Sequence, residues 1–194
     1  NYSDNYNYAT ITVGKNNIGI YNKNNHIENN GTINVTHDEA GTENIGAYNV
    51  AETGKNVAFI NYGTINVKGG KKNGTAGASI GIYSKTEGTA QAYILQPVVM
   101  NVESTSMNDG DIALGIYGKG KNTVIDVGMG STSTAVKANA IGIYLDGDNT
   151  SYIFGSNNFD LQSDISGKVG IGGYLKGGAR AEGVVNVSSS LTAL

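Results

Sequence analysis

The sequence contains no cysteine, no tryptophan and a single proline among its 194 residues. Without cysteine it can form no disulfide framework, thiolate zinc site or cysteine nucleophile. It has no run of about 18 apolar residues, so no helix of the chain is expected to cross a membrane. Cationic residues are sparse. The net charge is −3 and only Lys71 and Lys72 are adjacent, so nucleic-acid binding is not expected.

The chain is rich instead in glycine and asparagine, with 29 Gly and 25 Asn. Its hydrophobic fraction, 39 %, is low for a globular domain of this length. Ile, Val, Leu and Tyr nevertheless recur along the whole chain, which argues against disorder. Glycine, asparagine and threonine are spread evenly along the chain, which indicates internal repetition.

One repeated motif is an apolar residue, glycine, a small or apolar residue, and tyrosine. Its glycines follow one another at spacings of 27, 35, 34, 27 and 30 residues. The six copies are Ile18–Tyr21, Ile45–Tyr48, Ile80–Tyr83, Leu114–Tyr117, Ile141–Tyr144 and Ile171–Tyr174. Such regular recurrence predicts a structural unit of roughly 30 residues.

A second motif, typified by Thr-Ile-Asn-Val, alternates with the first. Its seven copies are Thr10–Val13, Thr32–Val35, Thr64–Val67, Val99–Val102, Val124–Val127, Asn158–Leu161 and Val184–Val187. A third short apolar segment separates the two motifs in some repeats, as at Val57–Ile60, Tyr93–Leu95 and Tyr152–Phe154, with His26-Ile27 as a short version. Alternating apolar and polar residues, bounded by glycine and asparagine turns, predict three short strands per unit.

Three short strands cannot bury their own apolar face, whereas stacked units can. We therefore expect an all-β fold, a right-handed parallel β-helix of about seven coils of roughly 30 residues, each with three short strands. Longer loops are expected at 68–78 and 104–111, with a smaller insertion at 128–138. An antiparallel sandwich or a propeller is the alternative, but a sandwich needs no matched motifs and a propeller blade is longer.

Strand alternation also predicts which side chains face inward. Ile18 and Ile20 should point into the core, and Gly19 and Tyr21 outward. The residues expected inside are Ile18, Ile20, Ile33, Val35, Ile45, Ile65, Val67, Ile80, Ile82, Ile116, Ile125, Val127, Ile141, Ile143, Val185 and Val187. The second motif should form an outward polar column of Thr12, Asn34, Asn66, Asn101, Asp126, Asp160 and Asn186.

The alternating motifs resemble those of the passenger domains of type V autotransporters, most closely the large fusobacterial outer-membrane adhesins. The resemblance is carried by the segments 29–35 and 61–67, which read Asn-Asn-Gly-Thr-Ile-Asn-Val and Asn-Tyr-Gly-Thr-Ile-Asn-Val. It covers essentially the whole chain, although the Gly-Thr pair is lost from Val99 onward. It implies that 1–194 is a single β-helical passenger fragment, with the signal peptide and translocator barrel outside it.

The resemblance further implies an exported protein at the bacterial cell surface or outer membrane. It would be a virulence-related adhesin that binds a surface protein or glycan of host or partner bacterial cells. Its only connection with a membrane would be the translocator domain. Two other hypotheses are a β-helical polysaccharide lyase or hydrolase and a structural stalk that presents a distal binding domain.

The candidate ligand-binding residues are aromatic and cationic. An outward tyrosine column beside a glycine strip could hold a sugar ring or a partner side chain, although a stacking ladder that stiffens the rod is the alternative reading. Lysines at the base of the 68–78 loop could assist, because loops on a rigid scaffold often carry recognition. The candidates are Tyr21, Tyr48, Tyr83, Tyr117, Tyr144, Tyr174, Lys71 and Lys72.

No catalytic set, metal site or cofactor is expected. The carboxylates Asp109, Asp111, Asp126, Asp146 and Asp148 lie in turns that are typical of Asp-Gly sequences. His26 and His37 have no evident Ser or Asp partners. We therefore expect a binding protein and not an enzyme; acidic residues grouped on one outward strand face would favour the enzyme.

Overall fold

The computed structural model describes residues 4–14, 16–36, 43–69, 78–96, 100–104, 112–137, 140–162 and 171–188. These residues form parallel β-sheets with no helix, so the all-β prediction is confirmed. None of them belongs to a helix that is long and apolar enough to cross a membrane.

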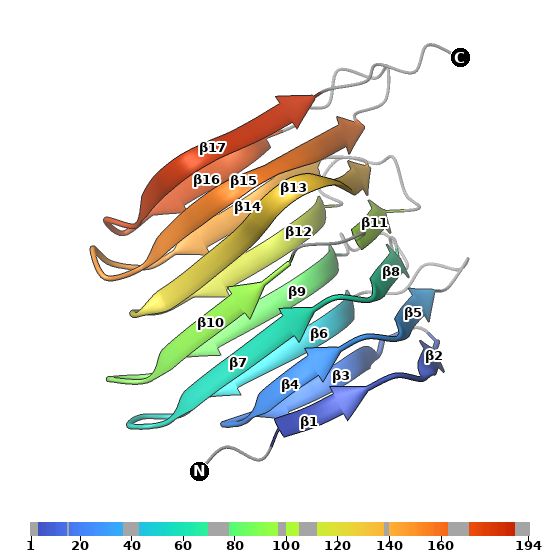
Figure 1. The fold of residues 1–194 in the computed structure, drawn as a ribbon, viewed down its shortest axis with the longest axis horizontal. Helices are drawn as coiled ribbons and strands as arrows, with labels where there is room; N and C mark the ends of the chain where they lie inside the picture. Colours follow the sequence, from blue (N-terminus) through green and yellow to red (C-terminus); the bar gives the residue numbers. More distant parts are fainter. Residues whose placement is uncertain are drawn as a thin grey trace.

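Seventeen strands follow one another along the chain (Figure 1). Their bounds are β1 Asp4–Asn7, β2 Thr10–Val13, β3 Ile18–Lys23, β4 His26–Asn29, β5 Thr32–Thr36, β6 Glu43–Ala51, β7 Asn56–Asn61, β8 Thr64–Gly69, β9 Ala78–Thr86, β10 Gln91–Leu95, β11 Met100–Ser104, β12 Ile112–Lys119, β13 Thr123–Lys137, β14 Ala140–Asp146, β15 Tyr152–Gln162, β16 Ile171–Lys176 and β17 Arg180–Ser188. The third apolar segment of the repeat forms strands of its own, as predicted, in β4, β7 and β10, whereas in β15 it continues into the second-motif copy Asn158–Leu161.

Every strand pairs in parallel with its equivalent one turn later. The first motif forms a six-stranded sheet in the order β16-β14-β12-β9-β6-β3. The other strands form two ladders, β1-β4-β7-β10 and β2-β5-β8-β11, which belong to one eleven-stranded sheet because the long strand β13 pairs with both β10 and β11. The predicted parallel β-helix is therefore confirmed as a β-solenoid.

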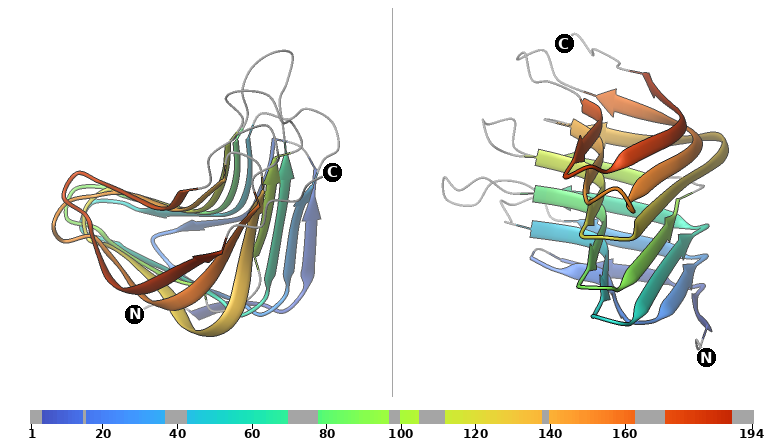
Figure 2. Two further views of the ribbon diagram at one scale, coloured as in Figure 1. Left: turned by 90° about the horizontal axis from the view of Figure 1, so that it is seen from above. Right: turned by 90° about the vertical axis from the view of Figure 1, so that its left-hand side faces the viewer.

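The solenoid has about four turns, so the predicted seven coils are not supported. Seen along its axis, the strands surround a narrow core (Figure 2). Four successive levels contribute fully buried core residues, represented by Ile33, Ile65, Ile94 and Ile125. The prediction equated each of the seven copies of the second motif with one coil, but the copy at Val124–Val127 pairs with β10 and not with the second-motif ladder.

The C-terminal part departs from the predicted unit of three short strands. The segment 128–138, expected to be an insertion, largely belongs to β13, whose pairing with β15 shifts register on both sides of Met129. The segment Val124–Val127 was assigned to the second motif, yet Val124 and Ile125 pair with Tyr93 and Ile94 of β10. The residues of a β-bulge interrupt the alternation of apolar and polar residues in the same way as a loop does. The sequence pattern therefore predicted a strand and an insertion where the structure has one bulged strand.

The central core contains most of the residues expected inside, among them Ile33, Val35, Ile65, Val67 and Ile82. The first residue of the glycine–tyrosine motif is the exception. Ile45, Ile80 and Leu114 form a separate cluster with the tyrosines, Ile141 packs against that cluster, and Ile18 is exposed. The prediction for the first motif position was therefore wrong.

The glycine of that motif explains the difference. A Cβ on Gly46 would lie 2.5 Å from Ile65 Cγ2 and 2.6 Å from the Gly81 carbonyl oxygen, so this glycine faces the core and not solvent. Residue pairing between β6 and β9 skips it, with Ile45 opposite Ile80 and Ala47 opposite Ile82. The chain bends at the glycine, so the residues on its two sides lie on opposite faces.

A buried ladder of amides runs along one corner of the solenoid. Asn7 donates to Asn29 (2.7 Å), Asn29 to Asn61 (2.6 Å) and Asn61 to Gln96 (2.9 Å). Asn29, Asn61 and Gln96 are completely buried. The Asn29 and Asn61 amides also reach the carbonyl two residues ahead, at Gly31 and Gly63. The ladder therefore holds the turn between two strands in the same conformation at each level.

Candidate functional site

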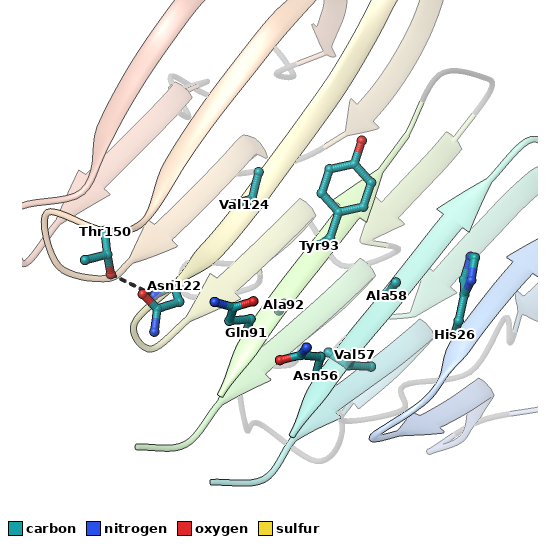
Figure 3. Close-up of a pocket in the computed structure, with 10 residues that line it drawn as sticks. All are labelled: His26, Asn56, Val57, Ala58, Gln91, Ala92, Tyr93, Asn122, Val124 and Thr150. Carbon is teal, nitrogen blue, oxygen red and sulfur yellow. Dashed lines mark hydrogen bonds between the residues drawn. The ribbon is translucent and has the colours of Figure 1, made fainter. Parts of the chain in front are cut away.

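A trough opens on the outer face of the β4-β7-β10-β13 ladder (Figure 3). Its volume is about 460 Å³, within the range of small-molecule sites. Strand alternation turns one residue in two of these strands outward. The lining residues are His26, Asn56, Val57, Ala58, Gln91, Ala92, Tyr93, Asn122, Val124 and Thr150.

Strand register makes the trough. His26, Ala58, Tyr93 and Val124 lie side by side on four successive strands. The small Ala58 side chain forms the floor, and the larger rings of His26 and Tyr93 rise on its two sides. The hollow therefore results from a small residue between two rings in one outward row.

Polar side chains lie along the edge nearest the turns. Asn56 pairs with Gln91 across β7 and β10, and Asn122 lies next to Gln91 because the Ala92 amide donates to the Asn122 carbonyl (3.1 Å). The Asn122 backbone amide donates to the Thr150 hydroxyl (2.9 Å). Asn122 has a left-handed backbone with φ 51°, which asparagine tolerates. Three amide side chains and one hydroxyl thus line this rim.

Tyr93 is fixed at the opposite end of the trough. Its hydroxyl donates to the Asp126 carboxylate (2.9 Å), which also accepts the Gly128 backbone amide (2.8 Å). Burial is the main cause of a strongly raised Tyr93 pKa, and the Asp126 hydrogen bond and charge raise it further. Tyr93 is therefore a neutral, oriented ring over the whole physiological pH range.

His26 lies in strand β4 and not in a loop, and it has the acidic partner that was not evident in the sequence. Its Nδ1 lies 2.9 Å from an Asp4 carboxylate oxygen one turn earlier. Its Nε2 is buried and has no hydrogen-bond partner among the described residues. The sequence did contain a clue to this contact. Asp4 and His26 are 22 residues apart, which is the same spacing as between the motif residues Thr10 and Thr32, and both pairs face each other on neighbouring strands. His37 lies outside the described residues.

Carboxylates do occur in the next outward row of the same face. Glu28, Asp126 and Glu182 share this row with Ile60, Leu95 and Phe154. Asp126 is held by Tyr93 and Gly128, and Glu182 accepts from Arg180 Nε at 2.8 Å. At least these two carboxylates are therefore already engaged by neighbours within the chain.

The six tyrosines selected from the sequence form one column on the six-stranded sheet. Tyr48, Tyr83, Tyr117 and Tyr144 stack with ring centroids 4.8 Å apart and interplanar angles of 1°, 11° and 16°. Tyr21 and Tyr174 meet the two ends of the stack edge-on. The four inner rings are half-buried over Ile45, Ile80 and Leu114. Most of the ring faces in this column are therefore covered by other rings.

The outward asparagine column is present in part. Asn66 donates to Asn34 and Asn101 to Asn66, both at 2.8 Å. Asp126 is not in the column, because the column continues from Asn101 to Ala135 and Asp160. The misassigned Val124–Val127 segment caused this error. Asn186 pairs with Asn158 and also lies outside the column.

The remaining candidates can be placed only partly. Lys71, Lys72, Asp109 and Asp111 lie outside the described residues. Asp146 is the last residue of β14 and Asp148 follows it before β15; both are half-buried, with Asp146 3.2 Å from Lys176 and Asp148 3.8 Å from Lys121. In the described part of the chain, no three His, Asp or Glu side chains come together as a metal site.

The trough and the tyrosine ladder are thus the two surface features with defined geometry, and they occupy different sheets. Comparisons with known proteins add no further guide. No family model, curated protein or solved structure matches this chain.

Proposed function

We propose that this chain is a binding module displayed on a bacterial surface, where it attaches the cell to a protein or glycan of host or partner bacterial cells. The proposal combines the motif resemblance to autotransporter adhesins with the trough on the β4-β7-β10-β13 face. Export as a passenger fragment, a role in virulence and the right hand of the coil belong to the same proposal.

The trough is the observation that carries the proposal. Its floor and walls come from neighbouring strands of one continuous ladder, so the side chains are preorganised and lose little freedom on binding. It combines apolar surface with a few convergent polar groups, which is typical of ligand sites. A rigid scaffold with such a concave patch supports recognition better than catalysis.

The test is attachment of the labelled protein to epithelial cells and to co-aggregating bacteria. Ala58→Arg fills the trough floor with a long charged side chain and should reduce attachment about tenfold or more. Thr12→Arg introduces the same residue at an exposed position of the neighbouring ladder and is the matched control. Equal attachment by both variants and the unchanged protein would contradict a role of the trough.

A structural stalk is the second candidate, and the ladders favour it. The stacked tyrosines and the two asparagine ladders repeat at successive levels, so they stiffen the rod along its axis. A stalk would present a binding domain elsewhere in a longer protein. It predicts that this chain attaches to no cell at all, which the same assay measures.

A further inference from the structure

The lining of the trough narrows the chemistry of its ligand. This inference rests on the proposed function, because it concerns the same site. We infer that the trough binds a neutral sugar residue, which stacks on Tyr93 and places its hydroxyls against the amide rim.

The Tyr93 ring supplies the stacking surface. It is half-buried and lines the trough, and Figure 3 shows its hydroxyl pointing away from Gln91 and Asn122. The Asp126 hydrogen bond holds the ring in this orientation. An apolar sugar face can lie on such a ring, because aromatic side chains bury large area at low entropic cost.

The rim supplies groups that both donate and accept. Each amide of Asn56, Gln91 and Asn122 has an NH₂ and a carbonyl oxygen. The Asn122 NH₂ donates to the Ala90 carbonyl (3.3 Å), and the Thr150 hydroxyl accepts from the Asn122 backbone amide and donates to the Asp148 carboxylate, so the other amide atoms of the rim are the ones offered to a ligand. Vicinal sugar hydroxyls have the same dual character. A row of amides on successive strands therefore matches a hydroxylated ligand better than a purely apolar one.

His26 forms one wall of the trough. Its Nδ1 lies 2.9 Å from an Asp4 carboxylate oxygen, and this contact holds the imidazole ring in place. Its Nε2 is buried, so the ring presents a fixed side, and not that nitrogen, to a ligand in the trough.

The charges near the trough favour a neutral ligand over an acidic one. Among the residues that the structure describes, no lysine, arginine, aspartate or glutamate lines it. The Asp126 carboxylate lies beyond Tyr93, and Glu28 lies in the adjacent outward row. These negative charges would repel a sialic acid or a uronate.

The experiment measures attachment to epithelial cells after three surface treatments. Mild periodate, which cleaves vicinal diols, should abolish attachment; sialidase and protease should leave it intact. A printed panel of neutral, sialylated and uronate-containing oligosaccharides should give signal with neutral glycans only. Tyr93→Ala should lower that signal about tenfold or more, and Tyr93→Phe should recover most of the loss because it keeps the ring.

Gln91→Leu should also lower the signal, and Tyr8→Ala, which removes a highly exposed tyrosine elsewhere, should not. Signal restricted to acidic glycans overturns the inference. Attachment that depends on Tyr93 but resists periodate also overturns it, and indicates a protein ligand while the proposed function survives. Failure to attach to any cell contradicts the proposed function itself.

Discussion

At the residue scale, single side chains in this solenoid are constrained by the level above and the level below. Gly46 illustrates this, because the Ile65 side chain from the other sheet occupies the space that a Cβ on Gly46 would need. A trough residue illustrates the same rule on the outside, since Tyr93 is held by a carboxylate from the next turn. Substitutions are therefore expected to act through these neighbours.

Gly46→Ala should destabilise the protein by about 1–3 kcal/mol, since its Cβ would overlap the Ile65 side chain and the Gly81 carbonyl. Gly14→Ala is the matched control, because a Cβ there meets nothing within 4 Å. Urea unfolding followed by circular dichroism measures both. If the two variants have equal stability, Gly46 does not face the core.

The Tyr93 pKa predicts a loss of stability in alkali. A tyrosine whose folded pKa is raised contributes stability below the unfolded value, near 10, and that contribution is lost as the pH rises toward the folded pKa. The free energy of unfolding should fall from about pH 10 upward. Urea titrations between about pH 9 and about pH 11.5 should show a smaller fall for Tyr93→Phe. An identical fall would refute the buried, hydrogen-bonded phenol.

At the element scale, the sequence was informative about strands and less so about bends. Alternation in Thr32–Val35 and Thr64–Val67 predicted their inward residues, because straight short strands follow a period of two. It failed at Ile45 and Ile80, since a glycine between them and the next core residue reverses the face. It also failed at Asp126, because the predicted strand 124–127 and most of the predicted insertion 128–138 form one bulged strand, β13.

The two amide ladders give an element-scale prediction. Asn61→Ala removes the middle member of a buried amide chain, so the Asn29 amide and the Gln96 oxygen each lose their hydrogen bond to Asn61, and the change should cost about 2–5 kcal/mol. Asn66→Ala makes the same change in the solvent-facing ladder and should cost less than about 1 kcal/mol. Differential scanning calorimetry separates the two, and equal losses would contradict the different burial.

At the scale of the whole molecule, the low hydrophobic fraction is explained by a thin core. The parallel stacking and the strand identities could be predicted because equivalent residues recur at matched spacing. The trough could not, because it depends on which small and large residues share one outward row. That row combines His26, Ala58 and Tyr93, which lie in three copies of the third apolar segment but differ in size and chemistry, and only strand register shows that they share one row.

A solenoid is stabilised mainly by contacts between neighbouring levels. Amide hydrogen exchange should therefore be slowest in β7 to β12, at the middle of the stack, and faster in β1 and β17, which have a neighbour on one side only. Mass spectrometry of peptic fragments gives this profile. Uniform protection from end to end would contradict level-by-level stability.

The central claim is that recognition belongs to the trough and not to the tyrosine ladder. Hydroxyl-radical footprinting of the protein, free and attached to fixed epithelial cells, tests this claim most directly, because tyrosine and histidine side chains report their own exposure. We predict protection of Tyr93 and His26 on attachment, with unchanged labelling of Tyr83, Tyr117 and Tyr144. Protection of the ladder with Tyr93 and His26 unchanged would contradict the account.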